Sequence, residues 1–268
     1  MIIDAHAHTF PDKIAERAIQ RLEKISGIKA ATNGTVADTL VQMKKAGVDK
    51  FLNLNIATSP NQQSTINTTA AENNEKYPEM ISTGSVHPDN PECVEELHRI
   101  KNLSIKAIKL HPDYQGFFID EEKLFPIYQT CSDLELPIVF HSGWDCYSPD
   151  LVHAVPEASA KIARKFPKLK MVLAHLGGLK MWDDVYSHLA GLENVYFDTA
   201  MAATYIKDTD IAMKIINKHP IDNIFLGSDC PWEFPEASIK FVESLPLTDD
   251  IKEKIFYKNA AKFFNIDL

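Results

Sequence analysis

The chain opens with Met1-Ile2-Ile3-Asp4-Ala5-His6-Ala7-His8, a short apolar run that leads into two histidines. Seven more short apolar runs follow, and polar or turn-forming residues bound each of them, as they bound buried parallel strands. The eight runs are Met1–Ala5, Lys50–Ile56, Met80–Val86, Ala107–Leu110, Pro137–Phe140, Lys170–Ala174, Asn194–Phe197 and Asn223–Leu226. We expect each run to form one strand of a parallel sheet.

Segments with helical spacing lie between these runs and after the last one. They are Lys13–Ile25, Val36–Ala46, Ser59–Tyr77, Pro91–Asn102, Glu121–Glu135, Pro149–Phe166, Met181–Ala190, Asp208–His219, Glu236–Ser244 and Asp249–Phe264. Eight strands that alternate with helices over roughly 250 residues are typical of a (β/α)8 TIM barrel. A doubly wound open sheet is the competing architecture, but no GxGxxG turn follows the first strand. We therefore predict an α/β fold, a TIM barrel, with one domain over residues 1–268.

The interval between the first two strands is longer than one barrel unit needs. It holds two helical patterns, Lys13–Ile25 and Val36–Ala46, which Gly27–Gly34 joins. Only the second is required to return the chain to the next strand. We expect the first to be a helical insertion over the barrel mouth, where a lid helps to exclude water.

Composition excludes several classes of protein. The 28 basic and 37 acidic residues give a net charge of −9, which argues against nucleic acid as a partner. No apolar run is long enough to span a membrane. The four cysteines form no CxxC pair, and no signal-peptide pattern precedes the first strand. These features favour a reduced, cytoplasmic protein that acts on a small molecule.

Polar residues gather at the predicted carboxyl ends of the strands, where TIM barrels build their active sites. They are His6, His8, His87, Lys109, His111, His141, His175, Asp198 and Asp229. His6 and His8 are two residues apart, so on a strand both side chains point to the same face. Together with His141 and Asp229 they offer three imidazoles and one carboxylate, a donor set that suits Zn²⁺ and also Mn²⁺, Co²⁺ or Fe²⁺.

The remaining rim residues have candidate roles and ordinary structural alternatives. Asp229 can accept a proton from a metal-activated water, and His175 can polarise a carbonyl group. However, histidines at strand ends also occur as core residues, and an aspartate there often caps the next helix. Substrate contacts are expected from a set that comprises Lys109, His111, Trp144, Arg17 and Arg21. A solvated helix face explains the two arginines equally well, and Asp198 is expected to support a ligand from behind.

The same positions resemble those of a known family. Asp4-Ala5-His6-Ala7-His8, Lys109-Leu110-His111-Pro112, Phe140-His141-Ser142-Gly143, Ala174-His175-Leu176-Gly177-Gly178 and Gly227-Ser228-Asp229-Cys230-Pro231-Trp232 resemble the motifs of the amidohydrolase superfamily. Within it, the chain is similar to the amidohydrolase-related (amidohydrolase 2) branch of metal-dependent TIM-barrel hydrolases. That branch also includes aminocarboxymuconate-semialdehyde decarboxylase and resorcylate-type decarboxylases.

The resemblance implies a role for each matching residue. His6, His8 and His141 would bind the metal, Asp229 would be a ligand or base, and His175 would be catalytic. Lys109 stands near the position where many members carry a carboxylated lysine between two metals, whereas a single ion is usual in this branch. We therefore expect Lys109 to contact substrate, with carboxylation as the alternative. The resemblance also allows a homodimer.

Three functions follow from these observations. The first is a metal-dependent hydrolase that opens a C–O or C–N bond in a small, carboxylated or cyclic substrate. The second is a non-oxidative decarboxylase of the same branch. The third is non-enzymatic: a barrel whose metal is structural, or one that only binds a small molecule. It is disfavoured because structural sites are closed by four ligands and the core of a barrel already stabilises it. We expect the hydrolase, with the decarboxylase as the alternative.

Overall fold

The computed structural model describes residues 1–268 and contains eight parallel strands. They are β1 (Ile3–Ala7), β2 (Lys50–Asn53), β3 (Met80–Ser82), β4 (Ile108–Leu110), β5 (Ile138–Phe140), β6 (Met171–Leu173), β7 (Val195–Asp198) and β8 (Ile224–Phe225). The strands pair in sequence order within two arcs, β1–β2–β3 and β4–β5–β6–β7–β8. Each one overlaps an apolar run that the sequence predicts as a strand.

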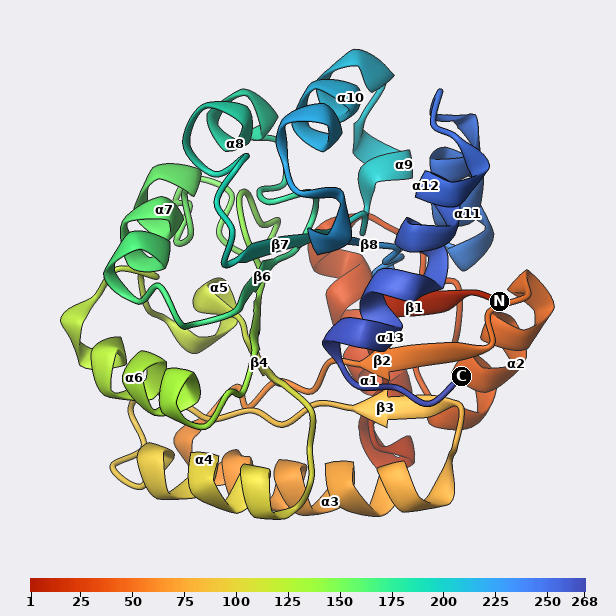
Figure 1. The fold of residues 1–268 in the computed structure, drawn as a ribbon. Helices are drawn as coiled ribbons and strands as arrows, with labels where there is room; N and C mark the ends of the chain where they lie inside the picture. Colours follow the sequence, from red (N-terminus) through yellow and green to blue (C-terminus); the bar gives the residue numbers. More distant parts are fainter.

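Single parallel bridges connect the two arcs at both junctions. Gly84, just beyond β3, bridges to Ile108 of β4, and Ala7 of β1 bridges to Cys230, which follows β8. The amide of Ala5 also donates to the carbonyl of Leu226 at 2.7 Å. Helices surround the strands on the outside (Figure 1). The predicted TIM barrel is therefore confirmed.

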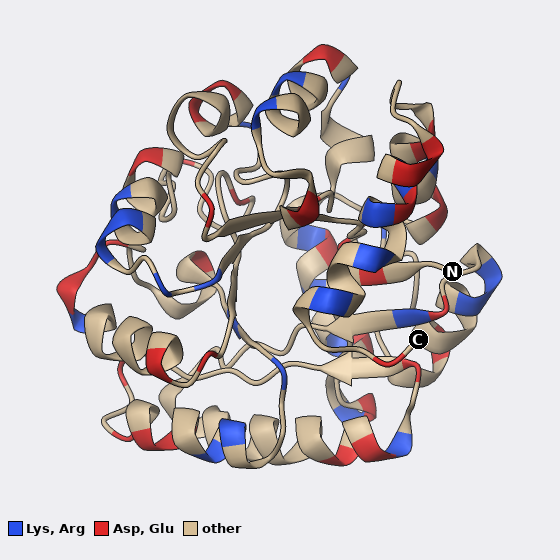
Figure 2. Ribbon diagram, in the orientation of Figure 1, with Lys and Arg blue, Asp and Glu red and all other residues tan.

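The helices follow the expected order around the barrel. They are α1 (Asp12–Ser26), α2 (Val36–Ala46), η1 (Pro60–Gln62), α3 (Gln63–Lys76), α4 (Cys93–Asn102), α5 (Pro112–Gln115), η2 (Glu122–Leu124), α6 (Phe125–Asp133), α7 (Pro156–Lys165), α8 (Trp182–His188), α9 (Ala202–Tyr205), α10 (Thr209–Lys218), η3 (Ile221–Asn223), α11 (Pro235–Ser244), α12 (Asp249–Glu253), η4 (Lys254–Lys258) and α13 (Asn259–Phe263). Charged residues lie mainly on these helices and their loops, whereas the strands carry few (Figure 2). No helix has the length and apolar character needed to cross a membrane.

Two apolar clusters hold the barrel together. The larger lies between the strands and the outer helices. The smaller fills the barrel interior and includes Ile3, Val139 and Phe225, together with Ala261 and Phe264 from the end of the chain. Because Ile3 begins β1, α13 and Phe264 pack close to the amino ends of the strands. The carboxyl ends are left for the polar side chains described below.

The structure differs from the sequence prediction at one helix that borders the site. The helix expected to begin at Pro149 begins instead at Pro156. A residue before proline avoids helical backbone angles, and Val155 is extended, so no helix can run through to Pro156. Residues 149–155 therefore belong to the β5–α7 loop. The last predicted helix is also divided, because the π-helical segment η4 separates α12 from α13.

Candidate metal centre

A cavity of about 990 Å³ opens at the carboxyl ends of the strands. His6, His8, His141, His175 and Asp229 all line it, so the structure brings the predicted rim residues together. The wall continues along the insertion α1, through Ile14, Ala18, Arg21, Leu22 and Ser26, and along a polar face of α3. The expectation that the first inserted helix covers the barrel mouth is therefore confirmed.

Three side chains form a nearly equilateral triangle of donor atoms. The Nε2 atoms of His6 and His8 lie 3.2 Å apart, and Asp229 Oδ1 lies 3.3 Å from the first and 3.1 Å from the second. Zinc–ligand bonds of roughly 2.1 Å place two ligands of a tetrahedral ion roughly 3.4 Å apart. The triangle thus has the size of one face of a coordinated ion. These residues fit a divalent metal without rearrangement.

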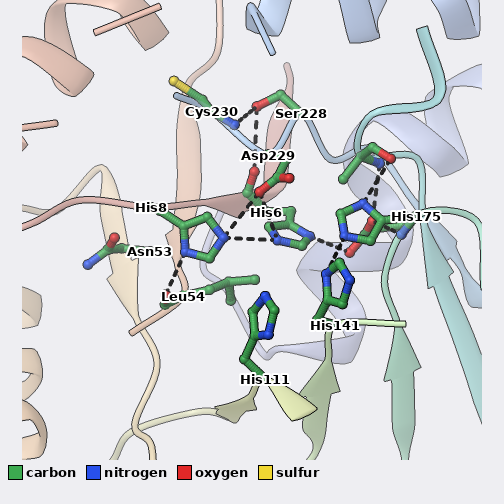
Figure 3. A network of polar contacts seen from close by, with 12 residues as sticks. His6, His8, Asn53, Leu54, His111, His141, His175, Ser228, Asp229 and Cys230 are labelled. Carbon is green, nitrogen blue, oxygen red and sulfur yellow. Dashed lines mark hydrogen bonds and ion pairs between the residues drawn. The ribbon is translucent and has the colours of Figure 1, made fainter. Parts of the chain in front are cut away.

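Hydrogen bonds behind the two histidines fix the orientation of both rings (Figure 3). His6 Nδ1 lies 2.8 Å from Asp198 Oδ2, and His8 Nδ1 lies 2.8 Å from the carbonyl oxygen of Leu54. Because both partners are acceptors, each Nδ1 carries the proton and each Nε2 keeps its lone pair for the cavity. Asp198 therefore lies where the sequence places it, behind a candidate ligand.

His141 and His175 face each other beside this triangle. His175 Nε2 lies 3.0 Å from His141 Nδ1, and His175 Nδ1 donates to the carbonyl oxygen of Ala200 at 3.2 Å. The structure does not include His141 in the compact group of His6, His8 and Asp229. The outer nitrogen of its ring, Nε2, lies instead 3.4 Å from Asp145 Oδ2.

A second group of donor atoms, from His111, His141 and Asp145, lies nearby. The two imidazoles are stacked, with centroids 4.3 Å apart and planes 7° apart. A metal binds a histidine nitrogen along a lone pair that lies in the ring plane, so lone pairs in parallel planes do not converge on one ion. His111 also stacks on Tyr114 at 3.7 Å. The stack forms a flat wall of the cavity.

Two functional candidates occupy strained backbone. His175 and Asp229 have φ angles of 62° and 70°, in the left-handed region that non-glycine residues rarely adopt. Gly143, two residues after His141, has a φ of 85°, and a Cβ there would lie 2.2 Å from the Leu179 amide nitrogen. Only glycine allows the β5–α7 loop to pass this close to the loop after β6. The strain concentrates where the candidate catalytic groups are held.

Burial sets the protonation state of the site. It lowers the pKa of His6, His141 and His175, so these imidazoles are neutral at pH 7, the form that binds metals. It raises the pKa of Asp145 to about 7. Lys109 on β4 is fully buried, and its Nζ has no hydrogen-bond partner. Burial lowers the pKa of Lys109 to about 8, although nearby carboxylates oppose the shift.

The predicted substrate residues are placed differently from one another. Lys109, His111, Trp144 and Arg21 line the cavity, whereas Arg17, although also on α1, does not. Sequence reasoning missed Asp145, which also lines the cavity. Its place four residues after His141, at a predicted strand end, is a signal that could have found it.

A family model described as Amidohydrolase matches residues 3–266. The chain belongs to the amidohydrolase family. Solved structures agree with this assignment of the fold. An uncharacterized TIM-barrel protein from Bordetella bronchiseptica matches this amidohydrolase with a TM-score of 0.78 at 18% identity, covering 98% of both chains.

Two further similar structures carry functional names. One is a 5-carboxyvanillate decarboxylase from Novosphingobium aromaticivorans, complexed with manganese and a nitrobenzoic acid. It has a TM-score of 0.71 at 17% identity and covers 99% of this amidohydrolase and 96% of its own chain. The other is a 4-oxalomesaconate hydratase from Rhodopseudomonas palustris, with a TM-score of 0.66 at 20% identity and the same coverage. At these identities the likeness establishes the fold.

Proposed function

We propose that this amidohydrolase is a metal-dependent hydrolase that cleaves a C–O or C–N bond in a small carboxylated or cyclic substrate. The observation that carries the proposal is the triangle of His6 Nε2, His8 Nε2 and Asp229 Oδ1, with edges of 3.1–3.3 Å. The triangle opens onto a cavity large enough for a small organic molecule.

The donor set fits Zn²⁺ best, with Mn²⁺, Co²⁺ or Fe²⁺ as further options. His6, His8 and Asp229 would hold the ion, and His141 is proposed to approach it with Nδ1. Bound there, a divalent metal acts as a Lewis acid and lowers the pKa of water to near neutrality. The similar 5-carboxyvanillate decarboxylase structure, which is complexed with manganese, supports a divalent metal in this fold.

The side chains around the triangle are proposed to transfer protons, orient the reactants and bind the substrate. Asp229 accepts a proton from the attacking water and returns it to the leaving oxygen or nitrogen. His175 lies beside the same space with the lone pair of its Nε2 turned inward, so it accepts a hydrogen bond from the attacking water and orients it. Lys109 pairs with a substrate carboxylate, since its buried ammonium group has no protein partner. His111 and Trp144 offer flat surfaces for the rest of the substrate, and Arg21 reaches the outer cavity.

The second candidate function is non-oxidative decarboxylation. In that reaction a C–C bond breaks, CO₂ leaves and a proton is added to carbon. The unpartnered Lys109 favours it as much as hydrolysis, because both substrates would carry a carboxylate. The named decarboxylases among the similar structures also favour it.

Metal content tests the proposed centre. Chelator-free protein is expected to hold close to one equivalent of zinc, manganese, iron or cobalt. His8→Ala and Asp229→Ala should lose the metal, whereas His98→Ala, an exposed histidine on α4, should keep it. If His8→Ala retains a full equivalent, the assigned centre is wrong. Close to two equivalents would instead support a carboxylated Lys109 between two ions.

Product analysis separates the two reactions. The metal-loaded protein would be incubated with lactones, esters, amides and aromatic carboxylates. Release of titratable acid or amine without CO₂ supports hydrolysis, whereas stoichiometric CO₂ supports decarboxylation. His175→Ala should keep its metal and lose most of either activity, by roughly 100-fold or more.

A further inference from the structure

In four of the five histidines that line the cavity, the outer ring nitrogens face oxygen atoms of the protein. Those of His6, His8 and His175 face Asp198, the Leu54 carbonyl and the Ala200 carbonyl, at 2.8, 2.8 and 3.2 Å. For His141, the outer nitrogen is Nε2. It faces two carboxylates, with Asp145 Oδ2 at 3.4 Å and Asp113 Oδ2 at 4.0 Å.

We propose that Asp145, assisted by Asp113, is a positioning residue that holds His141 in the tautomer and orientation needed for metal binding. The inference rests on the proposed metal-dependent function. Both carboxylates are acceptors when ionised, and they favour a proton on Nε2. The proton then leaves the lone pair on Nδ1, which lies toward His175 and the cavity.

The alternative tautomer leaves an unfavourable contact. With the proton on Nδ1, His141 donates to His175, but its Nε2 lone pair then faces two buried carboxylate oxygens. The protein shows this mismatch, because His141 Nε2 and Asp113 Oδ2 are both buried without hydrogen-bond partners. A cation bound at Nδ1 removes it by favouring the proton on Nε2, and we expect the 3.4 Å contact to shorten into a hydrogen bond.

Each carboxylate is held in place by its other oxygen. Asp145 Oδ1 accepts from the Tyr147 amide at 2.6 Å, and Asp113 Oδ1 accepts from His153 Nδ1 at 2.9 Å and from the Ser148 hydroxyl. All three of these partners belong to the β5–α7 loop, residues 141–155, which also supplies Asp145. The second oxygen of each carboxylate faces His141 and also His111, with His111 Nε2 3.7 Å from Asp145 Oδ2 and His111 Nδ1 4.0 Å from Asp113 Oδ2.

This arrangement links the substrate wall to the metal ligand. Trp144, Asp145 and Tyr147 all line the cavity from the same loop. A substrate that contacts Trp144 and Tyr147 would therefore contact the loop that also supplies Asp145, the residue proposed to orient His141. We accordingly expect Asp145 to affect both metal affinity and the environment of the bound metal.

The test compares Asp145→Ala and Asp145→Asn with Asp150→Asn, an exposed aspartate of the same loop. Metal-free proteins would be titrated with Zn²⁺ against a chromophoric chelator and with Co²⁺ by visible absorption. Asp145→Ala should weaken Zn²⁺ binding by roughly 10- to 100-fold and alter the cobalt spectrum. Asp145→Asn keeps one acceptor oxygen for the Tyr147 amide, so its NH2 group would face His141 Nε2 and favour the wrong tautomer. It should weaken Zn²⁺ binding at least as much as Asp145→Ala, while Asp150→Asn should match the wild type.

The outcomes separate this inference from the proposed function. If the wild type binds metal and both Asp145 variants match it in affinity and cobalt spectrum, the positioning role is wrong and the metal centre stands. If the wild type binds no metal, the proposed function fails and this inference fails with it. Should Asp145→Ala not fold, Asp145→Asn decides, because it preserves volume and the amide contact to Tyr147.

Discussion

Lys109 is a side chain whose burial reduces the stability of the folded protein. A fully buried ammonium group without a partner is costly, and burial lowers its pKa from 10.5 to about 8. We expect Lys109→Met to stabilise the metal-free protein by about 3 kcal/mol at pH 7. The same change should abolish or greatly weaken the binding of carboxylated substrates.

The sign of the pH dependence checks this explanation. Because the folded pKa lies below the unfolded value, the unfolded chain binds more protons between pH 8 and 10.5, and wild-type stability rises with pH there. The advantage of Lys109→Met should therefore shrink as the pH rises through this window. Urea unfolding at pH 7 and pH 9.5 measures the difference in unfolding free energy between Lys109→Met and the wild type. Lys106→Met, at an exposed position, is the control. A constant difference would contradict the assignment.

His219 is expected to contribute to acid unfolding. It is buried against Phe197, its Nε2 donates to the Val195 carbonyl at 3.0 Å, and burial lowers its pKa from 6.5 to about 4. As the pH falls, His219 is protonated in the unfolded chain before it is protonated in the folded one. The stabilisation that the neutral ring provides is therefore fully present above pH 6.5 and is lost as the pH falls toward 4. The loss amounts to about 3 kcal/mol.

A variant without the titrating ring isolates this effect. His219→Gln should be less stable than the wild type at pH 7, and the gap should narrow by up to about 3 kcal/mol by pH 4. Urea unfolding of metal-free protein across this range measures both. Parallel pH profiles would show that His219 does not titrate in this way.

Residue identities at the rim could be predicted from sequence, but their orientations could not. Strand ends carry His6, His8, His175 and Asp229 to one edge, which follows from periodicity and barrel topology. Which ring nitrogen faces the cavity depends on acceptors such as the Leu54 and Ala200 carbonyls, and no residue type at those positions signals them. Such acceptors appear only once the loops are folded.

At the scale of the element, regular segments with clear end signals were predicted best. Helix α2 has the predicted bounds because the Thr35 hydroxyl caps its start and Gly47 ends it in a left-handed conformation. The β5–α7 loop was missed because Pro149 resembles a helix start as much as Pro156 does. Asp113 and His153 meet through this loop, so their contact could not be anticipated.

The inserted helix α1 depends on the tight turn that follows it. Gly34 has a φ of 81°, and a Cβ there would lie 2.8 Å from Ile19 Cγ1 and 3.0 Å from Phe10 Cδ2. Gly27 has a φ of 70° but nothing within 4 Å. Both glycines adopt the left-handed conformation, and Gly27 is the C-cap of α1, but only at Gly34 would a side chain collide with α1.

Alanine substitutions at Gly27 and Gly34 distinguish the cost of left-handed backbone from the cost of displacing α1. Gly27→Ala should cost about 1–2 kcal/mol of stability. Gly34→Ala should cost about 1–3 kcal/mol more, because it also forces Ile19 and α1 outward. Urea unfolding measures the costs, and an increased KM in Gly34→Ala alone would show that α1 covers the bound substrate. Equal KM values in both variants would exclude that role.

At the scale of the whole molecule, stability and chemistry occupy opposite ends of the barrel. Phe264 and α13 pack into the interior near the amino ends of the strands, whereas the candidate metal centre lies at the carboxyl ends. We expect Phe264→Ala to cost about 3–5 kcal/mol of stability. Under conditions in which Phe264→Ala is folded, its affinity for Zn²⁺, measured by chelator competition, should match that of the wild type. A parallel loss of affinity would show that the two ends are coupled.

The contact of β1 with the chain after β8 has a consequence for protein synthesis. His6 and His8 are translated more than 200 residues before Asp229, their partner at 3.1–3.3 Å. Until then the two histidines form only part of a chelating site, and the nascent chain cannot retain an ion in the mature geometry. A metal can therefore bind in the mature geometry only after the segment that follows β8 has been translated.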